Sequence, residues 1–196
     1  MDETFIAAQT EVPPPENNPP QQPSLARAAI RWLREALETI LPAIAIAILI
    51  NLFLAQPTRV HGQSMEPNLH TDQRLVVEKI TYHLHGPRRG DIVVFALPEQ
   101  SEEMLIKRVI GLPGETVEIH DGQVFIDGVP LNEPYLTQDT RGRYGPVTVP
   151  PLHVFVLGDN RSFSNDSRAF DTVPIANIVG RAWLSYWPME ALGILD

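Results

Sequence analysis

Hydrophobic residues follow three different patterns along this 196-residue chain. Residues 11–24 hold six prolines and almost no apolar side chains, a composition that cannot bury enough surface to order itself. Residues 25–37 place apolar side chains near one helical face, and residues 40–55 form a run without a charge. Beyond residue 57 come short apolar segments separated by turns. We therefore expect a disordered, Pro-rich cytoplasmic tail over 1–24, a juxtamembrane and transmembrane helix over 25–56, and an extracytoplasmic domain over 57–196.

The charge-free run 40–55 is slightly shorter than the ~20 residues that cross a bilayer, and extension back to residue 36 supplies the rest. Arg27, Arg31 and Arg34 precede the run, whereas the first basic residue after it is Arg59. By the positive-inside rule, the N-terminus lies in the cytoplasm and residues 57–196 lie across the membrane. The alternatives are a buried core helix and a cleaved signal peptide. The apolar density opposes the first, and the long polar tail opposes the second.

The part of the chain beyond residue 57 shows the pattern of a β protein, because turn signals recur and no long helical period appears. Asp121-Gly122, between two alternating segments, is a strong hairpin signal. The sequence predicts a mainly β domain, an antiparallel β-barrel-like or folded-sheet assembly, preceded by one transmembrane helix. The expected strands cover residues 74–80, 91–96, 104–110, 116–120, 123–127, 147–149, 153–157 and 180–186.

Composition narrows the classes of function. The net charge of -9 and the pI of about 5.1 oppose a nucleic-acid partner, since phosphate binding needs a basic face. The chain has no Cys, which excludes disulfides, thiolate catalysis and Cys-ligated metals. His83 and His85 alone are a weak metal signal. We expect no metal and no cofactor.

Three short segments carry candidate chemistry: residues 62–69 with Ser64, residues 107–115 with Lys107, and residues 158–168. Each taken alone is typical of a loop, a solvated strand or a tight turn. A serine hydroxyl becomes a strong nucleophile only when a base takes its proton, and none of the six His lies in an obvious triad context. Lys107 is the best candidate base, because it shares a strand face with Leu105 and Val109. Burial there would lower its pKa and make the neutral amine available near pH 7.

Together and in this order, behind an apolar run, the three segments resemble those of the type I signal peptidases, or leader peptidases. The resemblance implies a membrane-bound serine endopeptidase with a Ser/Lys dyad and an acyl-enzyme intermediate. It implies that Ser64 is the nucleophile and that Lys107 is the general base for acylation and deacylation. The supporting residues implied by the resemblance are Ser164, which orients the Lys amine, the ion pair of Asp166 and Arg168, and Arg108, which joins that shell.

The resemblance also implies an oxyanion hole that includes the backbone N–H of Ser64. Some relatives have a Ser two residues before the nucleophile, where this chain has Gly62, so the second donor is left open. Asn68 stands where Thr is common. The expected substrates are preprotein signal peptides, cleaved after small residues of the Ala-x-Ala type. An extended substrate is expected to add as a strand beside residues 104–109. The expected residues of the small apolar pockets are Val60, Met65, Leu105 and Ile106.

Ser64 follows Ala55 by nine residues, so the nucleophile lies within about 30 Å of the end of the span, and the lipid bilayer is an expected partner. A secretion translocon is a further candidate partner. The plasma membrane is the default host, and a thylakoid membrane is the alternative. Two other functions remain in view. One is a different Ser/Lys protease, such as a self-cleaving repressor relative. The other is a catalytically silent, membrane-tethered β-domain that acts as an assembly factor.

Overall fold

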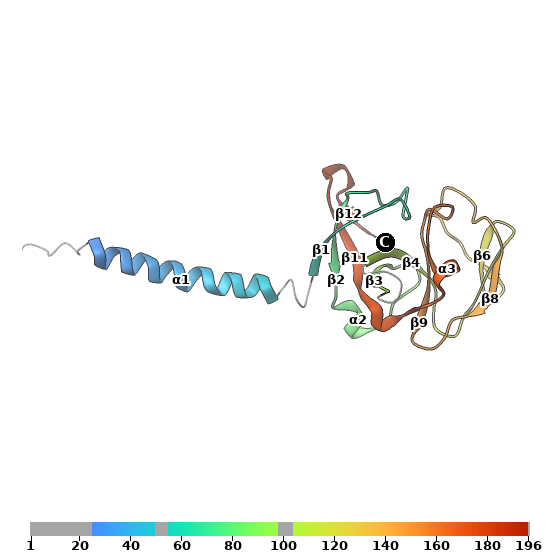
Figure 1. The fold of residues 1–196 in the computed structure, drawn as a ribbon, viewed down its shortest axis with the longest axis horizontal. Helices are drawn as coiled ribbons and strands as arrows, with labels where there is room; N and C mark the ends of the chain where they lie inside the picture. Colours follow the sequence, from blue (N-terminus) through green and yellow to red (C-terminus); the bar gives the residue numbers. More distant parts are fainter. Residues whose placement is uncertain (1–24, 50–54, 98–103, 196) are drawn as a thin grey trace, which may run out of the picture. The chain divides into compact units, whose positions relative to one another are not determined.

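A computed structural model describes residues 25–49, 55–97 and 104–195 (Figure 1). The chain divides into two units, residues 1–44 and 45–196, and each is considered by itself. Helix α1, Leu25–Leu49, covers the described part of the first unit and contains Pro42. The predicted tail over 1–24 and residues 50–54 of the predicted span lie outside the described residues.

Helix α1 carries its apolar side chains in exposed positions, with Leu41, Ile46 and Leu49 each more than half exposed. Within the described ranges, no helix is both long enough and apolar enough to cross a membrane. The predicted helical range to residue 56 differs from the structure at its end, because Ala55 and Gln56 belong to strand β1, Ala55–Arg59. Pro57 hid this strand from the sequence pattern, and proline is tolerated there because β1 lies at a sheet edge.

The larger sheet of the second unit runs in the order β1-β2-β11-β3-β4-β9-β10, with β12 paired to β11. All its pairings are antiparallel. No pairing of described strands joins β1 to β10, so the folded sheet is as predicted but the barrel is not closed. Beyond β1, the bounds of these strands are β2 Arg74–Glu78, β3 Ile92–Ala96, β4 Met104–Gly111, β9 His153–Leu157, β10 Val173–Pro174, β11 Ile178–Trp187 and β12 Gly193–Ile194.

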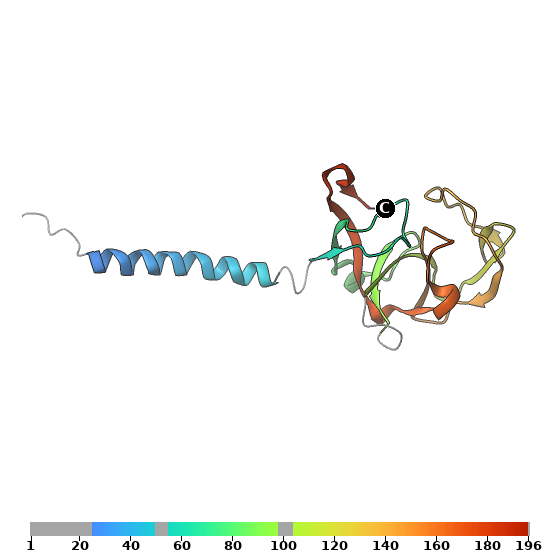
Figure 2. The ribbon, with the colours of Figure 1, turned by 45° about the horizontal axis from the view of Figure 1, so that its top comes forward.

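The smaller sheet has the order β7-β6-β5-β8 and lies at the opposite end of this unit from β1 and β2 (Figure 2). Its hairpin at Asp121 and Gly122 is as predicted, and both residues have positive φ, 49° and 81°, as a type I′ turn requires. Its strands are β5 Thr116–His120, β6 Gln123–Ile126, β7 Val129–Pro130 and β8 Tyr144–Thr148. The short helices of this unit are α2 Thr81–Leu84, α3 Ser167–Phe170, η2 Ile175–Asn177 and η3 Met189–Ala191.

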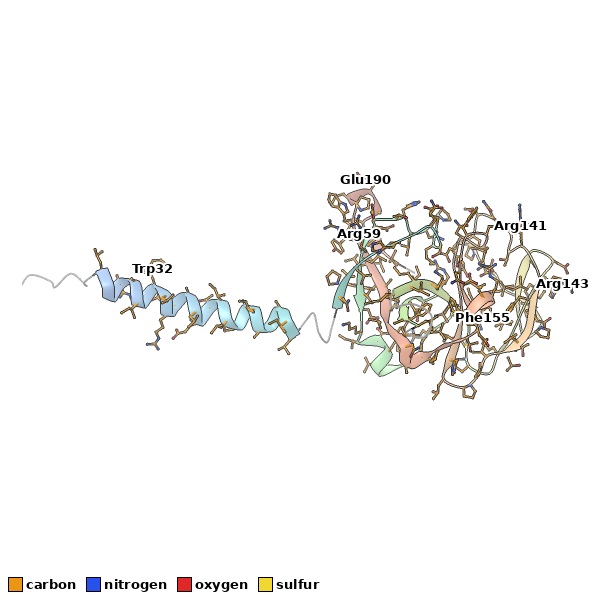
Figure 3. All side chains as sticks on the ribbon, viewed as in Figure 1. Trp32, Arg59, Arg141, Arg143, Phe155 and Glu190 are labelled. Atoms are coloured by element: carbon orange, nitrogen blue, oxygen red, sulfur yellow. The ribbon has the colours of Figure 1, made fainter. Side chains whose placement is uncertain are left out.

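The larger sheet has a hydrophobic core on both faces. The buried hydrophobic residues form three clusters. Successive residues of β3 alternate between two of them, with Ile92 and Val94 in the first cluster and Val93 and Phe95 in the third. A second cluster joins β9 to the smaller sheet, and Phe155 at its centre is fully buried (Figure 3). The strands that carry the candidate site therefore lie between packed layers, which restrict their movement.

A substitution of Gly180 in β11 would test how closely β11 packs against β2. A Cβ at Gly180 would stand 2.3 Å from Glu78 O and 2.9 Å from Val77 Cγ1. Gly180→Ala should therefore lower the free energy of unfolding by about 1–3 kcal/mol, measured by denaturant unfolding of the full chain. Gly86→Ala is the matched control, since nothing lies within 4 Å of the added carbon. Equal stability of the two variants would show that β11 and β2 can separate at little cost.

Candidate active site

Two residues 43 positions apart meet at the centre of the site. Ser64 lies in the loop after β1, and Lys107 lies in the middle of β4. The Lys107 amine is 2.7 Å from Ser64 Oγ and donates a hydrogen bond to it, and it also donates to Ile106 O at 3.0 Å. When Lys107 loses its proton the first bond can reverse, so that the hydroxyl donates to the amine lone pair. This is the contact that a general base needs in order to activate a serine.

Burial lowers the pKa of Lys107 from 10.5 to about 8, because the ammonium form loses its hydration. The carboxylates of Asp166 and Asp159 act in the opposite direction, and the loss of water outweighs them. Only 3% of the residue's surface is exposed. At pH 7 about one tenth of such an amine is neutral, against less than about 0.1% of an ordinary lysine.

Ser164 lies against Gly158, as the carbonyl of Ser64 does, and its hydroxyl makes no hydrogen bond to Lys107. Its buried hydroxyl has no hydrogen-bond partner in the described part of the chain. A Cβ built on Gly158 would stand 2.2 Å from Ser164 Oγ and 2.4 Å from Ser64 O, so both groups crowd against this glycine. The expected role of Ser164 in orienting the Lys107 amine stays a prediction. The close approach explains why residue 158 has no side chain.

Asp166 and Arg168 form an ion pair, at 2.8 Å between Asp166 Oδ1 and Arg168 Nε. The Asp166 side chain is fully buried. It also accepts hydrogen bonds from the backbone N–H of Gly158 at 3.1 Å and of Arg168 at 3.3 Å, the second of which caps α3. The pair thus joins α3 to the loop after β9, next to the base.

Arg108, expected to join the shell around the Asp166–Arg168 pair, forms an ion pair of its own with Asp159. It binds both carboxylate oxygens of Asp159 at 2.9 Å, with side chains only 4% and 0% exposed. Its guanidinium lies 4.0 Å from the ring centre of Tyr135. Asn68 Nδ2 donates to Asp159 as well, at 2.8 Å. Sequence reasoning missed Asp159, Tyr135 and Asn68. The Gly-Asp-Asn-Arg segment was the available signal for Asp159, and it was equally typical of a turn.

A third ion pair joins Arg161 to Glu133. We call the three pairs Asp166–Arg168, Arg108–Asp159 and Arg161–Glu133 the frame of the site. Arg161 binds Glu133 at 2.5 Å, and the two side chains are 2% and 7% exposed. Arg161 also bonds to Thr140 Oγ1 and to Gly158 O. The segment from Gly158 to Arg161 is therefore held on both sides of Asn160 by buried ion pairs.

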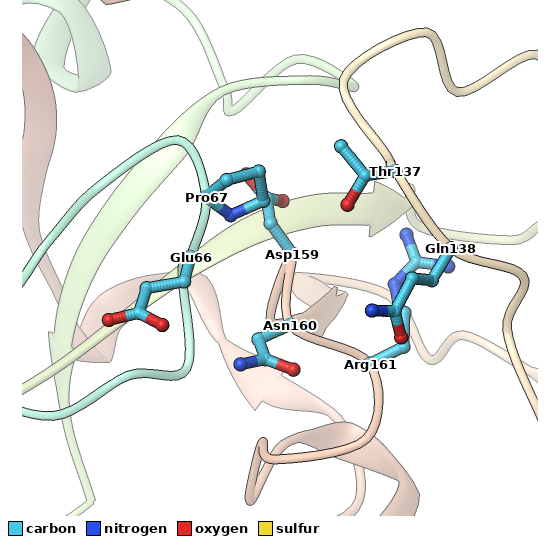
Figure 4. A pocket seen from close by; sticks show the side chains of 7 residues that line it. All are labelled: Glu66, Pro67, Thr137, Gln138, Asp159, Asn160 and Arg161. Carbon is cyan, nitrogen blue, oxygen red and sulfur yellow. The ribbon is translucent and has the colours of Figure 1, made fainter.

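A polar pocket of about 190 Å³ opens beside this frame (Figure 4). It is bounded by Glu66 and Pro67 from the loop between β1 and β2 that carries Ser64, called the nucleophile loop below for the role proposed for Ser64, and by residues of two other loops. The remaining lining residues are Thr137, Gln138, Asp159, Asn160 and Arg161. Among the side chains that the structure describes, no group of three or more His, Asp or Glu could hold a metal ion.

The four residues expected to line substrate pockets are largely covered. Val60, Met65 and Ile106 belong to the first core cluster and are 2%, 1% and 8% exposed. Leu105 is half-buried against the third cluster. Their contact with a substrate stays a prediction.

Strand β4 has an edge that is only partly paired. It pairs with β3 over Met104–Arg108 but with β9 only from Arg108 onward. On the β9 side, residues 104–107 have no ladder partner among the described strands.

Comparison with known proteins identifies relatives along most of the chain. Residues 33–187 match the family described as signal peptidase, peptidase S26. A signal peptidase I of Leptolyngbya laminosa is 42% identical, over 97% of both chains. A probable signal peptidase I of Synechocystis is 40% identical over 84% of this chain and 88% of its own. A crystal structure of a signal peptidase I from Enterococcus faecalis is 37% identical, with a TM-score of 0.45, over 50% of this chain and 97% of its own.

The buried pair of Arg108 and Asp159 predicts a large loss of stability when one partner is removed. Asp159→Ala should lower the free energy of unfolding by about 3–5 kcal/mol, because the buried guanidinium of Arg108 loses its carboxylate partner. Asp72→Asn is the control, because the φ of 71° at this position is tolerated by Asn but strains Ala. Its pair with Arg59 is 2.7 Å long, but both side chains are more than half exposed, so a loss below about 1 kcal/mol is expected. Denaturant unfolding of both variants makes the comparison, and equal losses would contradict the assigned burial.

Proposed function

The chain belongs to the signal peptidase family, peptidase S26, and is therefore a serine peptidase that acts on signal peptides; on this premise we propose that Ser64 and Lys107 form its catalytic dyad. The 2.7 Å contact between the Lys107 amine and Ser64 Oγ carries the proposal. The lowered pKa of Lys107, about 8, supports it, since a base works best when its pKa is near the working pH.

In the proposed reaction, Ser64 Oγ attacks the carbonyl carbon of the scissile peptide bond and its proton passes to Lys107 Nζ. The carbonyl oxygen becomes an oxyanion, which the backbone N–H of Ser64 stabilises. Collapse of this intermediate breaks the C–N bond, and Lys107 returns the proton to the leaving amine of the mature protein. Lys107 then deprotonates a water molecule, which hydrolyses the acyl-enzyme ester and releases the Ser64 hydroxyl. The ion pairs of Asp166 with Arg168 and of Arg108 with Asp159 hold these groups in place.

We infer that the signal peptide binds as an extended strand along β4. The absence of a ladder partner for residues 104–107 on the β9 side supports this, because a free edge offers its N–H and C=O groups to a peptide. The strand would lead directly to Lys107. Small side chains of the Ala-x-Ala type suit walls that leave little open depth, with Val60, Met65 and Ile106 on one face of β4 and Leu105 on the other.

We further infer that residues 36–55 anchor the protein in a membrane, with its N-terminus in the cytoplasm. The apolar run of the sequence supports this, together with the exposed apolar side chains of α1 and the arginines Arg31 and Arg34 before the run. The anchor would hold Ser64 near the bilayer, where secretory signal peptides leave their cleavage sites. The plasma membrane and the thylakoid membrane are the two candidate hosts, and a translocon is a candidate partner.

Removal of either member of the dyad should abolish cleavage. Ser64→Ala and Lys107→Ala are each expected to lose at least about 10³-fold in kcat while the thermal unfolding midpoint stays near that of the wild type. The assay is cleavage of a preprotein with an Ala-x-Ala site by the full chain in detergent. Lys79→Ala is the matched control, because Lys79 is the other lysine of the chain. Near-wild-type turnover by Lys107→Ala would exclude Lys107 as the base.

The dependence of kcat/KM on pH should report the titration of the Lys107 amine. Because the neutral form of Lys107 is the active base, kcat/KM should rise with pH, with an apparent pKa of about 8, and level off above it. Asp166 raises the pKa of Lys107, so Asp166→Asn should move the rising limb to lower pH. Profiles measured with one peptide substrate for both proteins test this. A limb that stays unmoved, or that moves to higher pH, would contradict the assignment.

A further inference from the structure

Asn160 holds the nucleophile loop through two hydrogen bonds to consecutive peptide groups. Its backbone N–H donates to Ser64 O at 3.0 Å, and its side-chain Nδ2 donates to Gln63 O at 3.1 Å. The neighbouring carbonyl is held too, because Thr71 Oγ1 donates to Gly62 O at 2.9 Å. Three successive carbonyls, from Gly62 to Ser64, are thus bonded to residues outside their own segment.

The bond to Gln63 O controls the direction of the Ser64 N–H. The two groups belong to one peptide unit, which is planar and trans, so they point to opposite sides of a single rigid plane. Whatever fixes the oxygen also fixes the hydrogen. A bond to the carbonyl further polarises the unit and makes the N–H a stronger donor. In the described part of the chain this N–H donates to no protein acceptor, which leaves it available for a ligand.

Resting on the proposed function, we propose that the Asn160 side-chain amide is a positioning residue that aims the Ser64 N–H at the oxyanion. Some relatives have a Ser where this chain has Gly62. Because Gly62 has no hydroxyl that could bind the oxyanion, the Ser64 N–H is the more important donor here. Asn160 does not touch the reacting atoms. It acts through the peptide plane between Gln63 and Ser64.

The residues on both sides of Asn160 hold its backbone in a fixed position, which suits this role. The residue before it, Asp159, is bound on both oxygens by buried Arg108, and the residue after it, Arg161, is bound by buried Glu133. Ion pairs as buried as these contribute little net stability, because desolvation of the charges offsets their attraction. They do hold the backbone on both sides of Asn160 in one place. The frame of buried charges therefore serves to deliver one amide group to Gln63 O.

The size of the effect is bounded by a second bond to the same oxygen. The backbone N–H of Glu66 also donates to Gln63 O, at 3.2 Å. Loss of the Asn160 amide thus loosens the peptide plane without freeing it. Deletion of an oxyanion donor typically costs 10²–10³-fold in kcat, so a misaimed donor should cost less, about 10-fold.

Two variants separate aiming from simple packing. Asn160→Ala removes the donor, and we expect kcat to fall about 10-fold with KM unchanged. Asn160→Asp keeps the shape but faces Gln63 O with a second oxygen, so it should lose more than the Ala variant. If Asn160 only filled space, the order would be reversed. Asn132→Asp, at an exposed position, is the control for the added charge.

A peptide aldehyde gives a readout that a structural role would not move. Ser64 Oγ adds to the aldehyde carbon, the serine proton passes to Lys107, and the former carbonyl oxygen carries the negative charge in the position of the oxyanion. The inhibition constant of the aldehyde should rise in Asn160→Ala by the same factor as kcat falls. The dissociation constant of the corresponding peptide amide, which cannot form the adduct, should not change.

The outcomes are distinguishable. If the wild type cleaves and both Asn160 variants keep its kcat and its aldehyde affinity, this inference is wrong and the dyad stands. It is equally wrong if the variants lose only peptide affinity, or if their activity falls only in step with the thermal unfolding midpoint. If the wild type neither cleaves the preprotein nor binds the aldehyde, the proposed function fails and this inference fails with it.

Discussion

Burial of the Lys107 amine is the constraint on which the rest of the site depends. An ammonium group without water loses its proton more readily, yet two carboxylates, those of Asp159 and Asp166, oppose this by attraction. Each carboxylate is bound to an arginine, Arg108 or Arg168, so each pair has little net charge. The acids can therefore anchor the loops around Lys107 without returning its pKa to the ordinary value of 10.5. This explains why such a small site contains so many buried ions.

The same ion pairs connect parts of the chain that are far apart. The loop after β9 meets the nucleophile loop through Asn160 and Asn68, and it meets β4 through Arg108. These three contacts span 97, 91 and 51 positions of sequence. Ser64, which carries both the proposed nucleophile and the proposed oxyanion donor, and Lys107, the proposed base, thus come from separate segments that share one rigid support. Preorganisation of this kind is the condition for electrostatic stabilisation of a transition state.

The sequence predicted the strands best where apolar and β-branched residues alternate. Residues 116–120 and 153–157 match the observed strands end to end. Strand β1 was missed, because Pro57 and polar neighbours give no strand signal and the pairing with β2 supplies the stability. Closure of the sheet could not be judged either, since it depends on whether two short edge strands meet, which no local pattern records.

Within the site, the resemblance suggested the meeting of Ser64 and Lys107, but not the partner of Arg108. Consecutive residues of a strand point to opposite faces, yet the Asp159 carboxylate that binds Arg108 also acts on Lys107, and no local pattern in the sequence records that arrangement. The contacts of Asn160 were beyond sequence reasoning for a different reason. Their acceptors are the backbone carbonyls of Gln63 and Ser64. Every residue has such a carbonyl, so the residue types at these positions do not reveal that the carbonyls accept hydrogen bonds.

The unpaired stretch of β4 has a consequence for how many different proteins one site can serve. Bonds between a strand edge and a peptide involve only main-chain groups, and these are the same for every amino acid except proline. An enzyme that holds its substrate in this way is nearly indifferent to the order of side chains along it. Selectivity then depends on the few positions where a side chain must fit against a closed wall. On the proposed binding along β4, a single copy of the site would process a large and unrelated set of substrates, and it would exclude others chiefly by the size of their side chains.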